Sequence, residues 1–261
     1  MSGEKTASPE PPCKTGDNAA GRAKTQVSLW ERVEHPSPPP RTPTLSHARI
    51  AAVAVKIADA EGIDAVTMRR IATELEVAPM AAYRYVSGKD EVLELMVDLV
   101  HADLTAADAP GDWRETMRLL ALRTRDLVLA HPWLSQLGSP RAMFAPTPNR
   151  LAVVEQALVS LEKAGLRPDL SMMVFDTVNS YVHGAAYTEV AMRMLIEEHG
   201  LTDTDGVKAS MAPGFVWLVG SGRYPAFLRS VEAGGRPGDP AGKFESGLEC
   251  VLDGIAARMR I

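Results

Sequence analysis

The sequence lacks paired cysteines and long apolar runs. Its two cysteines, Cys13 and Cys250, lie far apart in the chain and match neither a metal-binding spacing nor a disulfide framework. No segment approaches the roughly 18–20 apolar residues that a membrane span requires, and the N-terminal residues lack the apolar stretch of a secretory signal. We therefore expect a cytoplasmic protein with no membrane partner, no metal and no cofactor.

The chain also lacks an excess of basic charge and the motifs of common enzymes. Its formal net charge of −5 argues against a protein that coats nucleic acid non-specifically, but it is compatible with a small DNA-reading module in an acidic chain. The six histidines form no H-E-x-x-H pair, and neither a nucleophile elbow nor a glycine-rich phosphate loop is present. The sequence predicts that the chain is not an enzyme, and an enzyme is the least favoured alternative.

What is present is a proline-rich arm followed by helical periodicity. Residues 1–45 are rich in Pro, Gly, Ser and Lys, and we expect a disordered arm because they cannot bury enough apolar surface to offset chain entropy. The apolar patch at residues 27–30 either docks elsewhere or is incidental. Beyond residue 45, apolar residues repeat at three- and four-residue steps, without strand alternation. The sequence therefore predicts an all-α fold.

Capping residues, glycines and prolines separate the expected helices. Ser46 and Thr67 are plausible N-caps, and Gly62 ends the first helix. A tight connection at residues 76–79 leads to a third helix that runs to about Val86, and residues 87–90 start a long fourth helix. Further helices are expected at residues 113–130, 149–164, 168–199, 206–220 and 241–259, with a proline-punctuated loop over residues 140–148.

Three short helices within about 40 residues, the second and third joined by a tight turn, predict a helix-turn-helix. In this geometry the second helix braces against phosphates while the third lies in the major groove and reads bases. We place a DNA-binding domain of this all-α chain at residues 46–95 and a larger helical ligand-binding and dimerisation domain at residues 96–261.

Residues 46–95 resemble the tetracycline-repressor (TetR) family. The combination is specific, because a Thr and then an Arg open the second helix, Tyr-x-Tyr closes the third, and a Lys caps the fourth. A more diffuse resemblance to the family's C-terminal domain extends the match over about residues 46–200. The motifs that carry both are Ala58-Asp59-Ala60-Glu61-Gly62, Val66-Thr67-Met68-Arg69-Arg70-Ile71-Ala72, Leu75-Glu76-Val77, Ala82-Tyr83-Arg84-Tyr85-Val86-Ser87-Gly88-Lys89, Asn149-Arg150-Leu151, Leu158, Leu161, Gly165-Leu166 and Tyr181-Val182-His183-Gly184.

The resemblance implies a sequence-specific repressor, and it assigns DNA contacts residue by residue. Thr67 would cap the second helix and meet a phosphate, while the Arg69 guanidinium suits bidentate contact with guanine. Small or apolar groups at the start of the third helix would touch thymine methyls, and hydroxyl or ammonium groups at its end would contact phosphates. The implied DNA-binding residues are Thr67, Arg69, Arg70, Met80, Ala81, Tyr83, Arg84, Tyr85 and Lys89.

Two of these residues have an alternative role, and one turn residue departs from the family pattern. Tyr83 either contacts a phosphate or mainly packs the third helix, and Arg70 is either a DNA contact or a solvated charge. Glu76 stands where the family usually has Gly. A non-Gly residue at positive φ costs on the order of 1 kcal/mol, so we expect a slightly different or strained turn.

The expected helix at residues 168–199 supplies most of a sensor cavity, with loop and helix-end residues closing it. The candidate lining residues are Trp133, Met143, Phe144, Phe175, Asn179, Val182, His183 and Ala186. The alternative for each is that it simply fills a core. The apolar lining predicts a neutral or weakly polar organic effector, oriented by Asn179 and His183 one helical turn apart. A metal-chelated drug is disfavoured, because Gln136 replaces the histidine that precedes the Leu-Gly turn in tetracycline repressors.

The resemblance also implies a homodimer on a near-palindromic duplex, with two C-terminal helices from each protomer forming a four-helix bundle. The faces assigned to this bundle are Tyr181, Gly184, Ala185 and Thr188 on one helix and Phe244, Leu248, Val251, Ile255 and Met259 on the last. The main alternative is a helix-turn-helix activator or architectural protein without an effector. Ligand-dependent release from DNA distinguishes the two.

Overall fold

The computed structural model describes residues 28–35, 45–104, 112–201, 206, 214–232 and 240–261. The chain divides into two compact units, residues 1–37 and 38–261. In the first unit, α1 (Leu29–Glu34) is capped by Ser28, whose Oγ accepts a hydrogen bond from the backbone N–H of Glu31 at 3.1 Å. This helix differs from the disordered arm expected there. The missed signal is the Ser-x-x-Glu pattern of a capping box at residues 28–31. Residues 1–27 and 36–44 of the expected arm lie outside the described residues.

The described part of the second unit contains helices and no strand, which confirms the all-α prediction. Residues 214–220 are also helical. The elements are α2 (His47–Glu61), η1 (Ile63–Ala65), α3 (Met68–Glu74), α4 (Pro79–Ala82), α5 (Lys89–His101), η2 (Ala102–Leu104), α6 (Trp113–Ala130), η3 (Pro132–Gln136), α7 (Pro140–Phe144), α8 (Pro148–Lys163), α9 (Pro168–Glu198), α11 (Pro225–Glu232) and α12 (Pro240–Met259). None of the helices in the described ranges has the length and apolar character that a bilayer crossing requires.

Local sequence signals explain where most helices begin. The side chains of Ser46, Thr67 and Thr147 each accept a hydrogen bond from a backbone N–H of the first turn, as N-caps do. Pro168 occupies the first position of α9, where its missing N–H costs no helical hydrogen bond. These signals placed α2, α6, α8, α9 and α12 close to their expected ranges.

Two helices lie where the sequence predicts none. The expected loop over residues 140–148 contains α7, which Ser139 caps and in which Pro140 takes the first position. Pro140 therefore starts a helix instead of interrupting one. The short helix α11 was not predicted. Of the helix expected at residues 206–220, only residue 206 and residues 214–220 are described.

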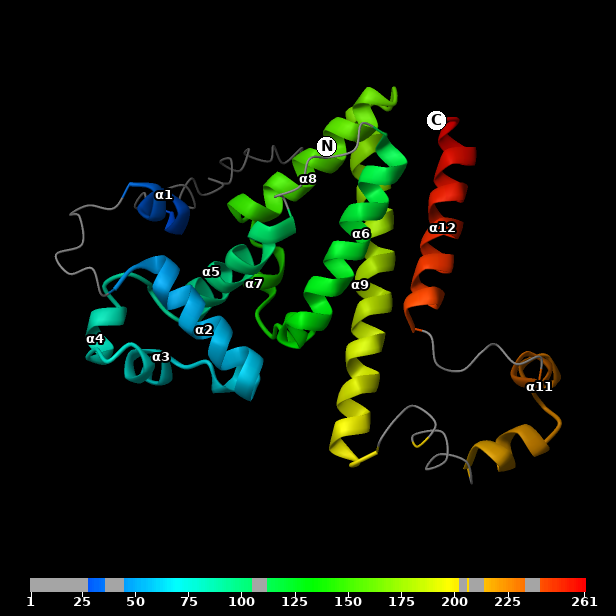
Figure 1. The fold of residues 1–261 in the computed structure, drawn as a ribbon, viewed down its shortest axis with the longest axis horizontal. Helices are drawn as coiled ribbons and strands as arrows, with labels where there is room; N and C mark the ends of the chain where they lie inside the picture. Colours follow the sequence, from blue (N-terminus) through cyan, green and yellow to red (C-terminus); the bar gives the residue numbers. More distant parts are fainter. Residues whose placement is uncertain (1–27, 36–44, 105–111, 202–205, 207–213, 233–239) are drawn as a thin grey trace, which may run out of the picture. The chain divides into compact units, whose positions relative to one another are not determined.

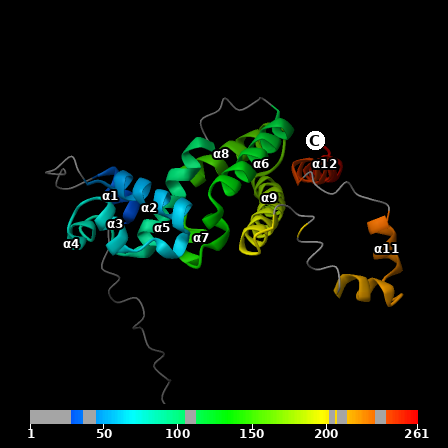
Figure 2. The same ribbon diagram turned by 60° about the horizontal axis from the view of Figure 1, so that its bottom comes forward.

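The N-terminal helices of the second unit pack around α5. Helix α2 lies against α5 and contacts α3, which in turn contacts α4 (Figures 1 and 2). Ile50, Ile71, Val92 and Met96 are almost completely buried and form the centre of this packing. Helix α5 is continuous across residue 95, where the sequence places the domain boundary.

The C-terminal helices share one apolar core. Helices α6 and α9 run side by side, and α8 and α12 pack against both of them (Figure 1). Phe244, Leu248 and Ile255 of α12 are buried in this core. These residues were assigned to contact with a second protomer, and that assignment is wrong, because they pack inside their own chain. Arg114 on α6 further holds α12 through ion pairs with Glu249 and Asp253.

Candidate DNA-binding and ligand-binding sites

The turn between α3 and α4 closes with the hydrogen bonds of a Schellman motif. The backbone N–H of Val77 donates to the carbonyl of Ala72 at 3.0 Å, and that of Glu76 donates to Thr73 at 3.1 Å. Glu76 has a φ of 56°, in the left-handed region that glycine favours. The turn therefore has the usual backbone geometry although Glu76 stands where the family usually has Gly. The difference from the family pattern is in the residue and not in the shape of the turn.

Helix α4, in the position of the reading helix, is shorter than the sequence predicts. It ends at Ala82 rather than near Val86. The chain then continues in tighter turns, in which the N–H groups of Arg84 and Tyr85 donate to the carbonyls three residues earlier, at 3.3 and 3.0 Å. This 3₁₀-like extension keeps the segment compact up to the start of α5.

Four predicted DNA-contacting residues are exposed and, in the described part of the chain, form no side-chain hydrogen bond or ion pair. Arg69 and Arg84 are exposed, and within the described ranges neither guanidinium has a side-chain partner. Met80 is 74% exposed and Tyr83 is 46% exposed. An exposed Met and a half-exposed Tyr at the two ends of the reading segment are available to a ligand as large as DNA.

The other predicted DNA contacts are engaged within the protein or less exposed. Arg70 forms ion pairs with Glu61 at 2.8 Å and Glu74 at 3.2 Å, and the hydrogen bond with Glu61 is the main cause of its raised pKa. Arg70 therefore fits the alternative of a surface charge. Lys89 donates from Nζ to the carbonyl of Ile63 at 3.3 Å, which uses one of its three donors.

Three residues remain from the predicted set. The ring of Tyr85 lies edge-on to that of His47 at 5.5 Å, and Thr67 uses its Oγ1 to cap α3. Ala81 is half-buried.

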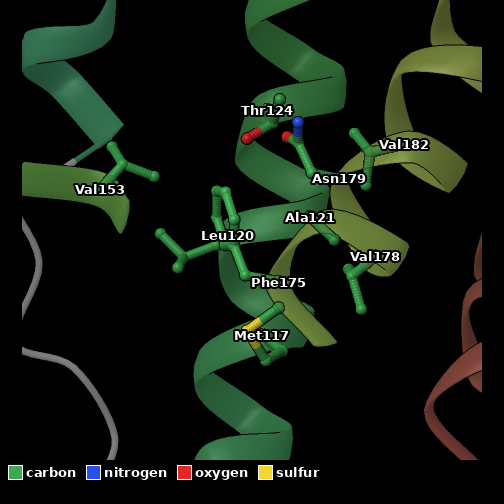
Figure 3. A pocket seen from close by; sticks show the side chains of 9 residues that line it. All are labelled: Met117, Leu120, Ala121, Thr124, Val153, Phe175, Val178, Asn179 and Val182. Atoms are coloured by element: carbon green, nitrogen blue, oxygen red, sulfur yellow. The ribbon is translucent and has the colours of Figure 1, made fainter. Parts of the chain in front are cut away.

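A small cavity lies between α6, α8 and α9 (Figure 3). Its volume is about 20 Å³, roughly the space of one water molecule. In Figure 3, Thr124 and Asn179 lie toward one end of it and Met117 toward the other. The lining residues are Met117, Leu120, Ala121, Thr124, Val153, Phe175, Val178, Asn179 and Val182.

The cavity contains only part of the predicted ligand-binding set. Phe175, Asn179 and Val182 line it, whereas Ala186 is fully buried elsewhere on α9. Trp133 is buried and donates from Nε1 to Oδ1 of Asp59 at 2.8 Å, so it joins η3 to α2.

The remaining predicted members lie outside the lining. Met143 is 37% exposed and Phe144 is 78% exposed, and neither lines the cavity. His183 also lies outside it, one helical turn beyond Asn179. Sequence reasoning missed the α6 side of the cavity, whose signal was the apolar stripe that begins at Trp113.

Four polar side chains influence one another electrostatically, and we call them the polar cluster: His101, Arg150, His183 and Tyr187. Arg150 donates from Nη1 to the carbonyls of Met143 at 2.8 Å and Ala145 at 3.2 Å. The rings of His183 and Tyr187 meet edge-on at 5.2 Å.

Burial controls the titration of this cluster. It lowers the pKa of His101 to about 4 and also lowers the pKa of His183, and in both cases the charge of Arg150 contributes in the same direction. Burial lowers the pKa of Arg150 and raises that of Tyr187. Both imidazoles are therefore neutral near pH 7.

The described residues do not bring together three His, Cys, Asp or Glu side chains that would hold a metal ion. Gln136, the residue that departs from the tetracycline-repressor pattern, donates from Nε2 to Sδ of Met194 at 3.1 Å.

Comparison with known proteins identifies the family. The family described as "Bacterial regulatory proteins, tetR family" matches residues 50–96, and the family "Tetracyclin repressor-like, C-terminal domain" matches residues 105–259. The chain is 34% identical to the HTH-type transcriptional repressor DrrR1 of Streptomyces coeruleorubidus, over 89% of this chain and 85% of that protein.

Solved structures give the same result. The TetR family protein ActR of Streptomyces coelicolor in complex with actinorhodin has a TM-score of 0.64 and 27% identity, over 83% of this chain and 97% of ActR. ActR in complex with (S)-DNPA has a TM-score of 0.62 and 28% identity, over 82% and 98%. This chain belongs to the TetR family of bacterial transcriptional regulators, with a helix-turn-helix DNA-binding segment followed by a helical tetracycline-repressor-like domain.

Proposed function

We propose that the protein is a homodimeric repressor that leaves its near-palindromic operator when a small organic molecule binds between α6, α8 and α9. The observation that carries the proposal is that α5 extends from the DNA-reading segment to the polar cluster. This helix begins at Lys89, directly after the reading segment, and ends at His101 in the polar cluster. A rigid helix that touches both sites provides a mechanical link between them.

Side-chain contacts attach α5 and α2 to the ligand-binding side. Asp98 accepts hydrogen bonds from the backbone N–H of Asn149 at 2.8 Å and from its Nδ2 at 3.0 Å. Glu94, which is buried, accepts from Nε of Arg141 at 2.7 Å. A shift of α7 or α8 would therefore move α5 and with it the DNA-binding helices.

The relatives support this proposal. DrrR1 is named a transcriptional repressor, and ActR has been crystallised in complex with (S)-DNPA and with actinorhodin. Because the cavity holds only about 20 Å³, a ligand must enlarge it on binding. Binding would then favour a conformation other than this one, which is the requirement for a ligand to change DNA affinity.

Small residues on the outer faces of α9 and α12 support dimerisation. Gly184 and Thr188 of α9 and Cys250, Gly254 and Ala257 of α12 are exposed. Small side chains allow a second pair of helices to approach closely, and a twofold axis would place two reading segments on two half-sites. In this proposal the exposed small residues form the dimer contact, in place of the apolar α12 residues that are buried within the chain.

The DNA-binding part is tested with an operator selected from a random duplex library. Arg69→Ala should weaken binding by about 1–3 kcal/mol and relax the sequence preference. The matched control is Arg70→Ala, because Arg70 is already paired with Glu61 and Glu74. Fluorescence anisotropy measures both variants. An equal loss in both would show that the exposed Arg69 is not a specific contact.

The effector-free alternative is tested with the same operator. A thermal-shift screen of small organic molecules identifies ligands, and each ligand is then added to the protein–DNA complex. Release of the operator supports the repressor proposal. Ligands that stabilise the protein but leave operator affinity unchanged would favour a helix-turn-helix protein without an effector.

A further inference from the structure

Arg150 brings a positive charge to the polar cluster, and no carboxylate in the described residues pairs with it. Arg114, Arg118, Arg125 and Arg141 each form an ion pair with a carboxylate. Arg150 is half-buried, and among the described residues it pairs with no Asp or Glu; its guanidinium donates to two backbone carbonyls. A partly buried charge without a counter-ion is less well solvated than a charge in open water, so the site favours a negative charge brought by a ligand.

The histidines leave this charge uncompensated. His101 lies 2.7 Å from the carbonyl of Val97 through Nδ1. Because a carbonyl only accepts, Nδ1 carries the proton, and Nε2 of the neutral ring carries the lone pair. His183 has a buried Nδ1 with no hydrogen-bond partner. The cluster thus combines one full positive charge with an unused hydrogen-bonding atom.

The cluster continues from the cavity along two helices. Arg150 lies one turn from Val153 on α8, and His183 lies one turn from Asn179 on α9; Val153 and Asn179 both line the cavity. Residues three or four positions apart share a helix face. Along α9, His183 follows Asn179 by one turn, and Asn179 lies with Thr124 at one end of the cavity (Figure 3). An elongated ligand would therefore meet apolar groups first and the polar cluster at one end.

We propose that Arg150 and His183 bind the acidic group of an organic acid whose apolar body fills the enlarged cavity between α6, α8 and α9. This inference rests on the proposed function, and it names the chemical class of the effector. It differs from the neutral effector expected from the sequence, because the apolar residues of α9 gave no indication of an unpaired guanidinium contributed by α8.

The acidic group would be held by charge-assisted hydrogen bonds. The guanidinium has donors in addition to Nη1, and an imidazole N–H of His183 supplies another. Tyr187 lies against the His183 ring and donates from its hydroxyl to the carbonyl of Leu134 at 3.4 Å. Tyr187 is therefore a positioning residue, which fixes the ring of His183.

Two fluorescent probes that differ only in charge test this site. 8-Anilino-1-naphthalenesulfonate carries an anionic group, and N-phenyl-1-naphthylamine is the same aromatic body without it. Titrations of the full-length protein without DNA give a Kd for each probe. Arg150→Met should raise the Kd of the anionic probe by about tenfold or more and change that of the neutral probe less than about twofold.

Further variants keep the test decisive if Arg150→Met folds poorly. Arg150→Lys retains the charge and should keep most of the preference for the anion. His183→Phe retains an aromatic ring against Tyr187 and should weaken only the anionic probe. Arg167→Met, which removes an exposed arginine paired with Asp169, is the control and should change neither Kd.

Two results would overturn the proposal: an anionic-probe Kd that Arg150→Met and His183→Phe leave unchanged, or equal losses for both probes in Arg150→Lys and His183→Phe. Failure of the proposed function gives a different result. In that case the anionic probe binds through Arg150 while neither this probe nor any screened ligand changes the affinity for operator DNA.

Discussion

Glu76 occupies a backbone conformation that costs free energy for any residue with a Cβ. Its φ of 56° closes the turn between α3 and α4, and the Schellman hydrogen bonds fix that turn whatever the side chain. The strain is therefore a property of this residue and can be removed without changing the reading segment.

Glu76→Gly should stabilise the protein by about 1 kcal/mol, or about 2–4 °C in Tm for a chain of this size. Glu76→Ala is the matched variant, since it removes the carboxylate but keeps the Cβ, and it should give no such gain. Thermal unfolding followed by circular dichroism measures both. Equal stabilisation by the two variants would assign the effect to charge.

His101 gives the protein a stability that depends on pH. Burial lowers its pKa to about 4, with Arg150, His183 and His131 contributing in the same direction. An unfolded histidine takes up its proton near pH 6.5, so between pH 6.5 and 4 the unfolded state binds more protons than the folded state. Stability should therefore decrease as the pH falls through this range, by about 3 kcal/mol in total from this group.

The measurement is urea unfolding at several pH values for the wild type and His101→Leu. The variant should lose the part of the pH dependence that His101 causes, and carboxylates that titrate near pH 4 act on both proteins alike. If the plots of stability against pH were parallel for the two proteins, His101 would not be buried in its neutral form.

At the scale of elements, one carboxylate joins the helix-turn-helix to the ligand-binding helices. Oδ1 of Asp59 on α2 accepts from Nε1 of Trp133 and from Nδ1 of His131, both at 2.8 Å. Because Trp133 is 2% exposed, its indole N–H has no access to water if Asp59 is removed. This contact stabilises the fold, and in the proposed function it is also part of the connection between the two sites.

Asp59→Ala should destabilise the protein by about 1–3 kcal/mol, the usual cost of a buried donor left without a partner. It should also reduce the change in operator affinity that a ligand causes, while ligand binding itself is kept. Asp126→Ala, an exposed carboxylate on α6, is the control. Denaturant unfolding and anisotropy with and without ligand measure the two effects. Unchanged ligand response in Asp59→Ala would place the connection elsewhere.

The sequence predicted elements better than it predicted sites. Helix-start signals such as Thr67 and Pro168 are local, and for that reason α3 and α9 begin where expected. Whether Arg70 is free to contact DNA depends on Glu61, nine residues away, and no local helix-start signal reveals that contact. The sequence gives no sign that Arg150 belongs to the site, since its lack of a carboxylate partner is a property of the packed structure and not of any sequence window.

At the scale of the whole molecule, two glycines face outward on the helices assigned to the dimer. Among the described residues, a Cβ at Gly184 or Gly254 would meet no atom of another element within 4 Å, whereas a Cβ at Gly247 would overlap the hydroxyl of Tyr181. Larger side chains at the first two positions therefore leave the protomer intact and act only on an approaching partner.

Gly184→Leu combined with Gly254→Leu should give a folded monomer with weakened operator binding, because the two half-sites are no longer bound together. The helix propensity of Leu exceeds that of Gly, so the protomer should not lose stability. Ala152→Leu, on the exposed side of α8, is the control. Sedimentation equilibrium measures the mass. A double variant that stays dimeric would show that the interface lies on other helices.

The size of the cavity also governs how fast an effector can act. With room for about one water molecule, the cavity cannot hold an organic ligand in this conformation, and α6, α8 or α9 must first move apart. The observed association rate should then rise with ligand concentration only until it reaches the rate of opening, and level off there. After entry, the same helices must separate again before the ligand leaves. The regulator would respond slowly to a brief pulse of effector and retain the signal after the free concentration has fallen.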